Sequence, residues 1–149
     1  EVNGIRVAGG TTTYRNNMIA LGDGMIVAIG SAATNSATSG INGIGEGAII
    51  RGCRVARNEQ GGISLSNAHG ALVTGNTVTY NAFVGIGFSG DGGLIERNTL
   101  VGNSGVGISA SATTGFGGNV LTGNNSGGSQ TSGGVQLGSN VCGNDTACP

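Results

Sequence analysis

The sequence has 149 residues, of which 33 are glycine and only 9% are charged, and its formal net charge is −1. Abundant glycine without a Gly-X-Y period excludes collagen, and the many β-branched residues exclude a disordered chain. A near-neutral chain lacks the basic patch that nucleic-acid binding requires, and no apolar run approaches the roughly 18 residues of a membrane span. The length therefore indicates one domain, residues 1–149, with no nucleic-acid partner and no membrane span.

Taken in chain order, the strand-like segments repeat with a period near 22 residues. A corner column aligns when "LVTGNTVTYN" is placed over "LIERNTLVGN" and "GFGGNVLTGN", and it contains Asn17, Cys53, Asn76, Asn98 and Asn119. The strand that follows is predicted to point its first residue inward, at Ile5, Val27, Ile63, Ile86, Ile108 and Val135. The steps along this second column are 22, 36, 23, 22 and 27 residues, so we expect two insertions, over residues 31–43 and 125–134.

Short alternating strands joined by Gly and Asn corners predict a parallel β-solenoid of about six coils of roughly 22 residues each. A helical repeat would need apolar residues at a period of 3.6, and none is present. Asn76 and Asn81 are two corners of one coil in this reading. We expect each of them to bond to the equivalent amides of the neighbouring coils and to form a ladder along the stack.

These repeats resemble the right-handed parallel β-helix proteins of the pectin-lyase-like superfamily, and the ending "SNVCGNDTACP" resembles the tail of secreted bacterial members. The resemblance implies an all-β right-handed parallel β-helix. It leaves the function open, because that superfamily includes lyases, hydrolases, epimerases, phage tailspikes and non-catalytic modules. The stack is short for the superfamily and "EVNGIRV" is already strand-like, so we expect the C-terminal part of a longer chain. An N-terminal coil left open would expose a strand edge through which copies could self-associate.

The three cysteines allow one disulfide at most. Cys142 and Cys148 are close in a tail rich in Gly, Asn and Asp, whereas Cys53 lies about four coils away, roughly 19 Å at the usual strand spacing. That distance exceeds the roughly 7 Å limit between bridged Cα atoms. We predict a Cys142–Cys148 disulfide that pins the C-terminal end and a buried Cys53 thiol outside it. A disulfide implies an oxidising compartment, so we expect a secreted or cell-surface protein.

The outward strand positions are predicted to form a face without acids, which disfavours the acid cluster that catalytic β-helices usually carry. These positions are Arg6, Ala28, Ser64, Gly87, Ser109 and Gln136.

A neighbouring column offers candidate substrate-binding residues. It reads Arg15, Arg51, Thr74, Glu96 and Gly117, and it predicts two arginines stacked one coil apart. Forked guanidinium groups bind carboxylates and sulfates, so Arg15, Arg51 and Glu96, with Tyr80 near a corner, are candidates for binding an acidic polysaccharide. The alternative is that these arginines only keep a weakly charged surface soluble.

The single histidine, His69, stands at a predicted corner between Glu46 one coil below and Asp91 one coil above. This column could supply a general acid or base, and Glu46 and Asp91 are weak candidates for holding Ca²⁺; no other cofactor is predicted. With Arg51, these three residues are the candidates for catalysis. The alternative is three exposed loop residues that happen to stack.

The favoured function is an extracellular, non-catalytic β-helix module with a structural or polysaccharide-binding role. A first alternative is a lyase or epimerase of acidic glycans that uses either Arg15 and Arg51 or the Glu46–His69–Asp91 column. A second alternative is a piece of a phage tailspike or surface adhesin.

Overall fold

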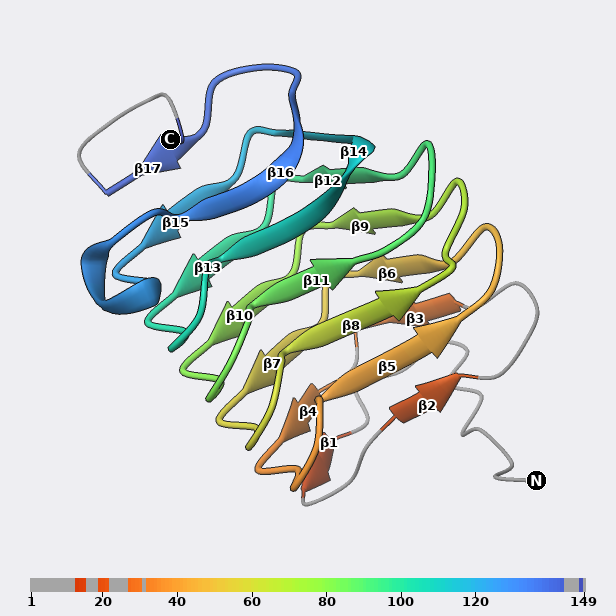
Figure 1. The fold of residues 1–149 in the computed structure, drawn as a ribbon. Helices are drawn as coiled ribbons and strands as arrows, with labels where there is room; N and C mark the ends of the chain where they lie inside the picture. Colours follow the sequence, from red (N-terminus) through yellow and green to blue (C-terminus); the bar gives the residue numbers. More distant parts are fainter. Residues whose placement is uncertain (1–12, 16–18, 22–26, 31, 144–147, 149) are drawn as a thin grey trace.

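The structure is a computed structural model that describes residues 13–15, 19–21, 27–30, 32–143 and 148. Over these residues the chain winds as a parallel β-solenoid of about five turns, slightly fewer than the six predicted (Figure 1). The one helical element in this part of the chain is a short 3₁₀ turn, η1 (Asn125–Gly127). No helix within it has the length and apolar character needed to cross a membrane.

Three faces run along the stack, and every strand pairs in parallel with its counterparts one coil away. Face A is a seven-stranded sheet of β1 (Thr13–Arg15), β4 (Ala32–Thr34), β7 (Arg54–Ala56), β10 (Thr77–Thr79), β13 (Thr99–Val101), β15 (Val120–Thr122) and β17 (Val141–Cys142). Face B contains β2 (Ile19–Leu21), β5 (Ile41–Ile44), β8 (Ile63–Ser66), β11 (Ile86–Phe88) and the first parts of β14 (Ile108–Gly117) and β16 (Thr131–Gln136). Face C contains β3 (Val27–Ile29), β6 (Ile49–Arg51), β9 (Leu72–Thr74), β12 (Leu94–Glu96) and the later parts of β14 and β16.

The core is a set of stacked aliphatic columns, one or two for each face. Successive strand residues point to opposite sides, so a three-residue strand places either its middle residue or its two ends inward. On face B the predicted inward residues Ile63, Ile86 and Ile108 are buried as expected. The other buried columns are Ile50, Val73, Ile95 and Phe116 on face C, and Val55, Val78, Leu100 and Leu121 on face A. Register is strongly specified here, because a slip of one residue would expose a whole column.

Two asparagine ladders run along the corners of the solenoid, as predicted. In the ladder between faces A and B, the backbone N–H and the side-chain Nδ2 of Asn58 both donate to Asn81 Oδ1, at 3.1 and 2.8 Å. The same two-donor pattern repeats from Asn81 to Asn103 and from Asn103 to Asn124. The other ladder, between faces C and A, joins Asn76, Asn98, Asn119 and Asn140 in the same way.

Each ladder asparagine except Asn140 is preceded by a residue in the left-handed region, and the asparagine itself is not in that region. Tyr80 (φ 56°) precedes Asn81, and Gly75 (φ 64°) precedes Asn76. The turn is therefore made by the residue before the ladder, and the asparagine is left to satisfy the backbone and side-chain groups of adjacent coils.

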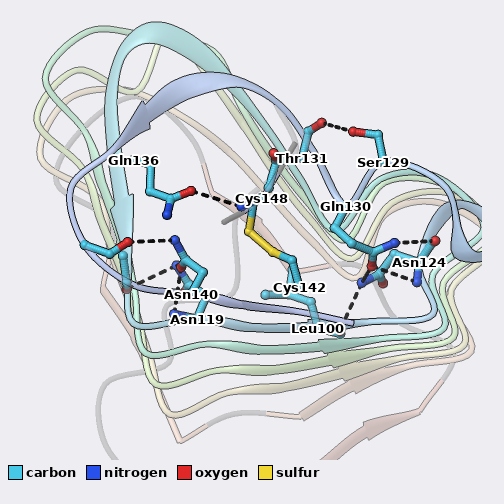
Figure 2. Close-up of a disulfide and its surroundings, with 12 residues drawn as sticks. Leu100, Asn119, Asn124, Ser129, Gln130, Thr131, Gln136, Asn140, Cys142 and Cys148 are labelled. Atoms are coloured by element: carbon cyan, nitrogen blue, oxygen red, sulfur yellow. Dashed lines mark hydrogen bonds between the residues drawn. A yellow bond between two sulfur atoms is a disulfide. The ribbon is translucent and has the colours of Figure 1, made fainter. Parts of the chain in front are cut away.

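In the last described coil, other polar groups take the places of ladder asparagines. Gln130 Oε1 accepts from Asn124 N and Nδ2 at 3.1 and 2.9 Å, taking the place of the next ladder amide. The predicted Cys142–Cys148 disulfide is present and lies between the ends of the two ladders (Figure 2). Cys142 is in register with the core residue Leu121, and Cys148 packs against the core. The two bridged cysteines therefore lie at the end of the apolar columns.

The two predicted insertions are wrong, because both segments belong to ordinary coils. Ile41 pairs with Ile19 and Ile63, and Thr131 rather than Val135 pairs with Ile108. By backbone register, the column of face B that contains Ile63 therefore reads Ile19, Ile41, Ile63, Ile86, Ile108 and Thr131, with steps of 22 or 23 residues. Val27 lies on face C, whereas Ile5 and Asn17 lie outside the described residues.

A coil without ladder asparagines explains the misalignment of the first coils. Ser36 occupies a ladder position there, and its backbone N–H donates to Asn58 Oδ1 at 2.9 Å. Because serine replaces asparagine, the sequence signal for this coil is lost, and its residues read as an insertion.

Cys53 occupies a ladder position of the other corner. Its backbone N–H donates to Asn76 Oδ1 at 2.8 Å, and its buried Sγ donates to Ala28 O at 3.4 Å. Asn76 Nδ2 donates to Ile50 O, which is in register with Ala28 one coil on. The thiol therefore makes a weaker version of the ladder's amide-to-carbonyl bond.

We expect Cys53→Asn to raise the free energy of unfolding by about 1 kcal/mol, because an amide would donate to Ala28 O and to Asn76 Oδ1 where the thiol donates weakly. Urea denaturation of the variant measures this gain. The control Cys53→Ala should be less stable than the parent chain, since it leaves Ala28 O without this donor and opens a small cavity. A Cys53→Asn chain less stable than the parent would contradict the proposed equivalence of thiol and amide.

Candidate functional site

An open groove with a volume of about 560 Å³ lies on face B. It crosses three successive coils, over β8, β11 and β14. Its lining residues are Ser39, Glu59–Gly61, Ile63–Ser66, Ala82–Val84, Gly87–Ser89 and Ser109.

The floor of the groove consists of small outward-facing residues. Ser64, Gly87 and Ser109 are in register across the three strands, and Ser66 and Ser89 extend the floor at the strand ends. No hydroxyl of these four serines bonds to another described residue, so all of them face the groove with donors and acceptors available. Gly87 has no side chain and so leaves open space in the floor. A Cβ at that position would meet nothing closer than Ile63 O at 3.9 Å.

One wall of the groove is built from the loops that follow the ladder between faces A and B. Phe83 N donates to Gln60 O at 3.1 Å, and Gly105 N donates to Phe83 O at 3.0 Å, so the loops stack like the strands. The Phe83 side chain is 64% exposed at this wall, and Glu59 is exposed on the coil below. The wall thus offers the ring of Phe83, the side-chain amide of Gln60 and the carboxylate of Glu59 above a floor of serine hydroxyls.

The predicted outward column is correct in its middle and wrong at its ends. Ser64, Gly87 and Ser109 stand together on face B, and no acid lies among them. Ala28 lies on face C, and Gln136 pairs there with Phe116. Their places on face B are taken by Asn42 and Ser132; Arg6 lies outside the described residues.

The predicted Arg15–Arg51 stack is wrong, because the two residues belong to different sheets. Arg15 is in register with Thr34 on face A; nothing further is described of its side chain. Arg51 is in register with Thr74, and Thr74 with Glu96, on face C. Arg51 is exposed and forms no ion pair within the described residues, whereas Glu96 lies 3.9 Å from Arg97 Nη1.

Tyr80 lies at the corner between faces A and B and does not line the groove. The Arg57 guanidinium carbon is 6.0 Å from the centre of its ring, on the coil below. On the coil above, a Cβ at Gly102 would come within 2.7 Å of Tyr80 Cε1. The ring therefore lies between Arg57 and Gly102 along the stack, and Tyr80 is 57% exposed.

The Glu46–His69–Asp91 column stacks as predicted, with Gly47 N bonded to His69 O and Gly70 N to Asp91 O. His69 Nδ1 accepts from Asp91 N at 3.2 Å and lies 3.6 Å from Asp91 Oδ2. Thr113 Oγ1 donates to Asp91 Oδ1 at 2.8 Å. Within the described part of the chain, no three His, Cys, Asp or Glu side chains are grouped so that they could hold a metal ion. The Glu46–His69–Asp91 column is therefore not such a group.

The His69–Asp91 pair stands next to the groove in the chain. Asp91 follows the groove residue Ser89 by two positions, and His69 follows Ser66 by three. Both side chains are well exposed, at 48% and 73%. Neither residue lines the groove; both follow the strands of face B, whereas the loop that carries Phe83 precedes β11.

The residues that build the groove wall were missed as site residues in the sequence. A signal existed in "NEQGG", "NAFVG" and "NSGVG", which occupy equivalent places between a ladder asparagine and the next strand. Stacking these three segments would have placed Glu59, Ala82 and Ser104 at one level and Gln60, Phe83 and Gly105 at the next. The two residues after each asparagine differ in type from coil to coil, which is why periodicity alone did not single them out.

Comparison with known proteins gives one family and one structure. Residues 2–145 match the family described as "Right handed beta helix region". A crystal structure described as the periplasmic alginate epimerase AlgG matches with a TM-score of 0.67 and 22% identity. The match covers 75% of this chain but only 29% of the epimerase chain, and at this identity it establishes a shared fold alone. Among curated proteins none matches this sequence.

The family match extends over nearly the whole chain and agrees with the parallel coils, the two asparagine ladders and the stacked core. This chain is a member of the right-handed β-helix family.

Proposed function

We propose that this chain is a non-catalytic, extracytoplasmic polysaccharide-binding module that holds a glycan in the groove over β8, β11 and β14. The observation that carries the proposal is the groove itself, in which four serine hydroxyls form the floor beside the exposed Phe83 ring. A pyranose ring presents hydroxyls at its rim and C–H groups on its faces. Serine hydroxyls can bond to the hydroxyls at the rim, and an aromatic side chain can pack against the C–H groups of a face.

A binding role is favoured over glycoside hydrolysis by the charges in the groove. Most glycoside hydrolases need two carboxyl groups that flank the scissile bond. Among the described lining residues only Glu59 has a carboxylate, and it belongs to the wall. The floor residues Ser64, Gly87 and Ser109 offer neither an acid nor a base of suitable pKa.

A catalytic alternative rests on His69 and Asp91. A lyase or epimerase of uronic acids removes a proton next to a carboxyl group, and a histidine side chain is a suitable base for that step. The pair stands near the groove in sequence, which keeps this alternative open to test. The matching structure is described as an alginate epimerase, which associates the same fold with a polysaccharide.

An extracytoplasmic location is supported by the Cys142–Cys148 disulfide, since such bridges persist in oxidising compartments. The matching structure is described as periplasmic, which agrees with this proposal.

Filling the groove tests the proposal. Gly87→Leu places a side chain on the groove floor without backbone strain, because the nearest atom to a new Cβ is 3.9 Å away. Affinity electrophoresis against immobilised glycans should show binding by the parent chain and at least a tenfold loss in the variant, or about 1.4 kcal/mol. The melting temperature should stay within about 2 °C of the parent, as for other surface strand changes.

The matched control is Thr77→Leu, which adds the same side chain to an exposed outward position on face A. It should leave glycan binding unchanged. Equal binding by the parent chain and Gly87→Leu would exclude this groove as the site. Turnover of a uronate polymer, followed as ultraviolet absorbance and lost in His69→Ala, would replace the non-catalytic proposal with the catalytic alternative.

A further inference from the structure

We infer that the groove selects uncharged glycans and discriminates against uronate polymers; this inference rests on the proposed function and specifies its ligand. The sequence alone favoured an acidic polysaccharide, on the basis of arginines that were expected to stack. The observation that reverses this expectation is the distribution of charge around the groove.

The described groove lining contains one charged side chain, the carboxylate of Glu59, and no cation. A glycan carboxylate placed in the groove would lose part of its hydration and would meet a like charge with no counter-charge to offset either effect. A neutral sugar hydroxyl, in contrast, would donate to the same carboxylate in a charge-assisted hydrogen bond. Glu59 therefore acts in opposite directions on the two classes of ligand.

The arginines of the described structure are held away from the groove. Arg51 ends β6 on face C, and Arg54 begins β7 on face A, where it is exposed. The Arg57 guanidinium lies 6.0 Å from the ring centre of Tyr80, directed along the stack at the corner between faces A and B. Arg97 lies beside Glu96 at the corner between faces C and A. None of them lines the groove.

The remaining lining groups match a neutral sugar chain. The hydroxyls of Ser64, Ser66, Ser89 and Ser109 can each both donate and accept, so they pair with sugar hydroxyls in either orientation. Phe83 is 64% exposed and is anchored through its backbone to Gln60 and Gly105. It can cover the apolar face of one pyranose at the wall while the hydroxyls below engage the rim. The groove spans three coils, so we expect a chain of sugars along the solenoid axis and not a single monosaccharide.

The experiment compares two polymers with the same sugar backbone, polygalacturonate with charged carboxylates and its uncharged, fully methyl-esterified form, together with cellohexaose, xylohexaose and mannohexaose as neutral probes. Binding of the full chain is measured by biolayer interferometry. The esterified polymer or at least one neutral hexaose should bind ten times more tightly than polygalacturonate, and Phe83→Ala should weaken that binding about threefold to tenfold, as for loss of an aromatic contact.

The Glu59→Gln variant tests the charge directly while keeping the shape of the wall. It should raise the affinity for polygalacturonate and lower the affinity for the neutral ligand, so that the ratio of the two falls at least threefold. Raising the salt concentration should reduce the discrimination of the parent chain, because like-charge repulsion at an exposed site is screened. The matched control is Glu46→Gln, which removes a carboxylate outside the groove and should leave the ratio unchanged.

Two results would overturn the inference, and they differ in what they imply for the proposed function. A preference for polygalacturonate over its methyl ester would overturn the neutral-glycan inference and leave the binding module in place. No binding of any of the five probes by the folded chain would overturn both.

Discussion

Replacing Asn81 with alanine is expected to lower the free energy of unfolding by about 4 kcal/mol, because two buried donors would lose their acceptor at about 1–3 kcal/mol each and a cavity would remain. Asn81 is fully buried, and its Oδ1 accepts from both Asn58 N and Asn58 Nδ2. Its Nδ2 donates to Asn103 Oδ1 at 2.8 Å and to Val55 O at 3.4 Å. Alanine can replace none of these bonds, and the site is closed to water. Urea denaturation followed by circular dichroism measures the loss.

The control for this prediction is Asn42→Ala, which removes the same side chain from an outward position of β5. Asn42 is partly exposed and takes no part in either ladder, so its loss should cost less than about 0.5 kcal/mol. If the two variants lost the same stability, the ladder would not be the source of the coil-to-coil stability that its geometry suggests.

Gly85→Ala is expected to destabilise the chain by about 3 kcal/mol, at the upper end of the range for overpacking. Its φ is not in the left-handed region, so the cost is one of space and not of backbone conformation. A Cβ at Gly85 would lie 2.6 Å from Gly107 O, 2.9 Å from Leu100 Cδ2 and 3.0 Å from Asn103 Nδ2. Relieving these contacts means moving the next coil's backbone, a core leucine and a ladder amide together. Thermal and urea unfolding both report this change.

Gly87→Ala provides a control two residues further along the same chain. A Cβ there meets ordinary contact distances of 3.9 Å and 4.0 Å. The change should be neutral or slightly stabilising, since alanine restricts the unfolded chain more than glycine does. A large loss at Gly87 together with none at Gly85 would contradict the coil register described above.

The ladder and the glycine column together explain the Asn-to-Gly spacing in the repeats. Asn81 and Gly85 are four residues apart in one coil, and Asn103 and Gly107 repeat the arrangement in the next. The amide of Asn103 occupies the space that a side chain at Gly85 would need. The two positions are therefore coupled through packing, and a substitution at either one disturbs the other.

The fold class, the ladder and the disulfide could be predicted because each follows from local chemistry repeated at a fixed spacing. Apolar residues at period two identify inward strand positions, and asparagine at a fixed corner indicates a ladder. Cys142 and Cys148 were the two cysteines close enough in sequence to bridge, and they do so. Cys53 was expected to be buried outside the bridge, and its thiol is buried at a ladder position.

The register of the first and last coils could not be predicted, because the residues at the key positions depart from the repeat. Ser36 stands where an asparagine was sought, and Thr131 stands where an aliphatic residue was sought. Ser36 and Thr131 can occupy these positions because their hydrogen bonds and shapes fit the neighbouring coils. The error carried through to the site, because it placed Arg15 over Arg51 when their strands belong to different faces.

The amino-acid sequence by itself determined the solenoid and its two ladders, since these depend on side-chain types that recur every 21 to 23 residues, and it identified the two cysteines that form the disulfide. Only the tertiary structure decided where a ligand could lie. The groove arises where the dissimilar loops around Gln60 and Phe83 stack beside a floor of small residues. The charge of the groove depends on the positions of the arginines, which lie on other faces and at the corners. Such proximity between coils is a property of the stacking and leaves no motif in any one repeat.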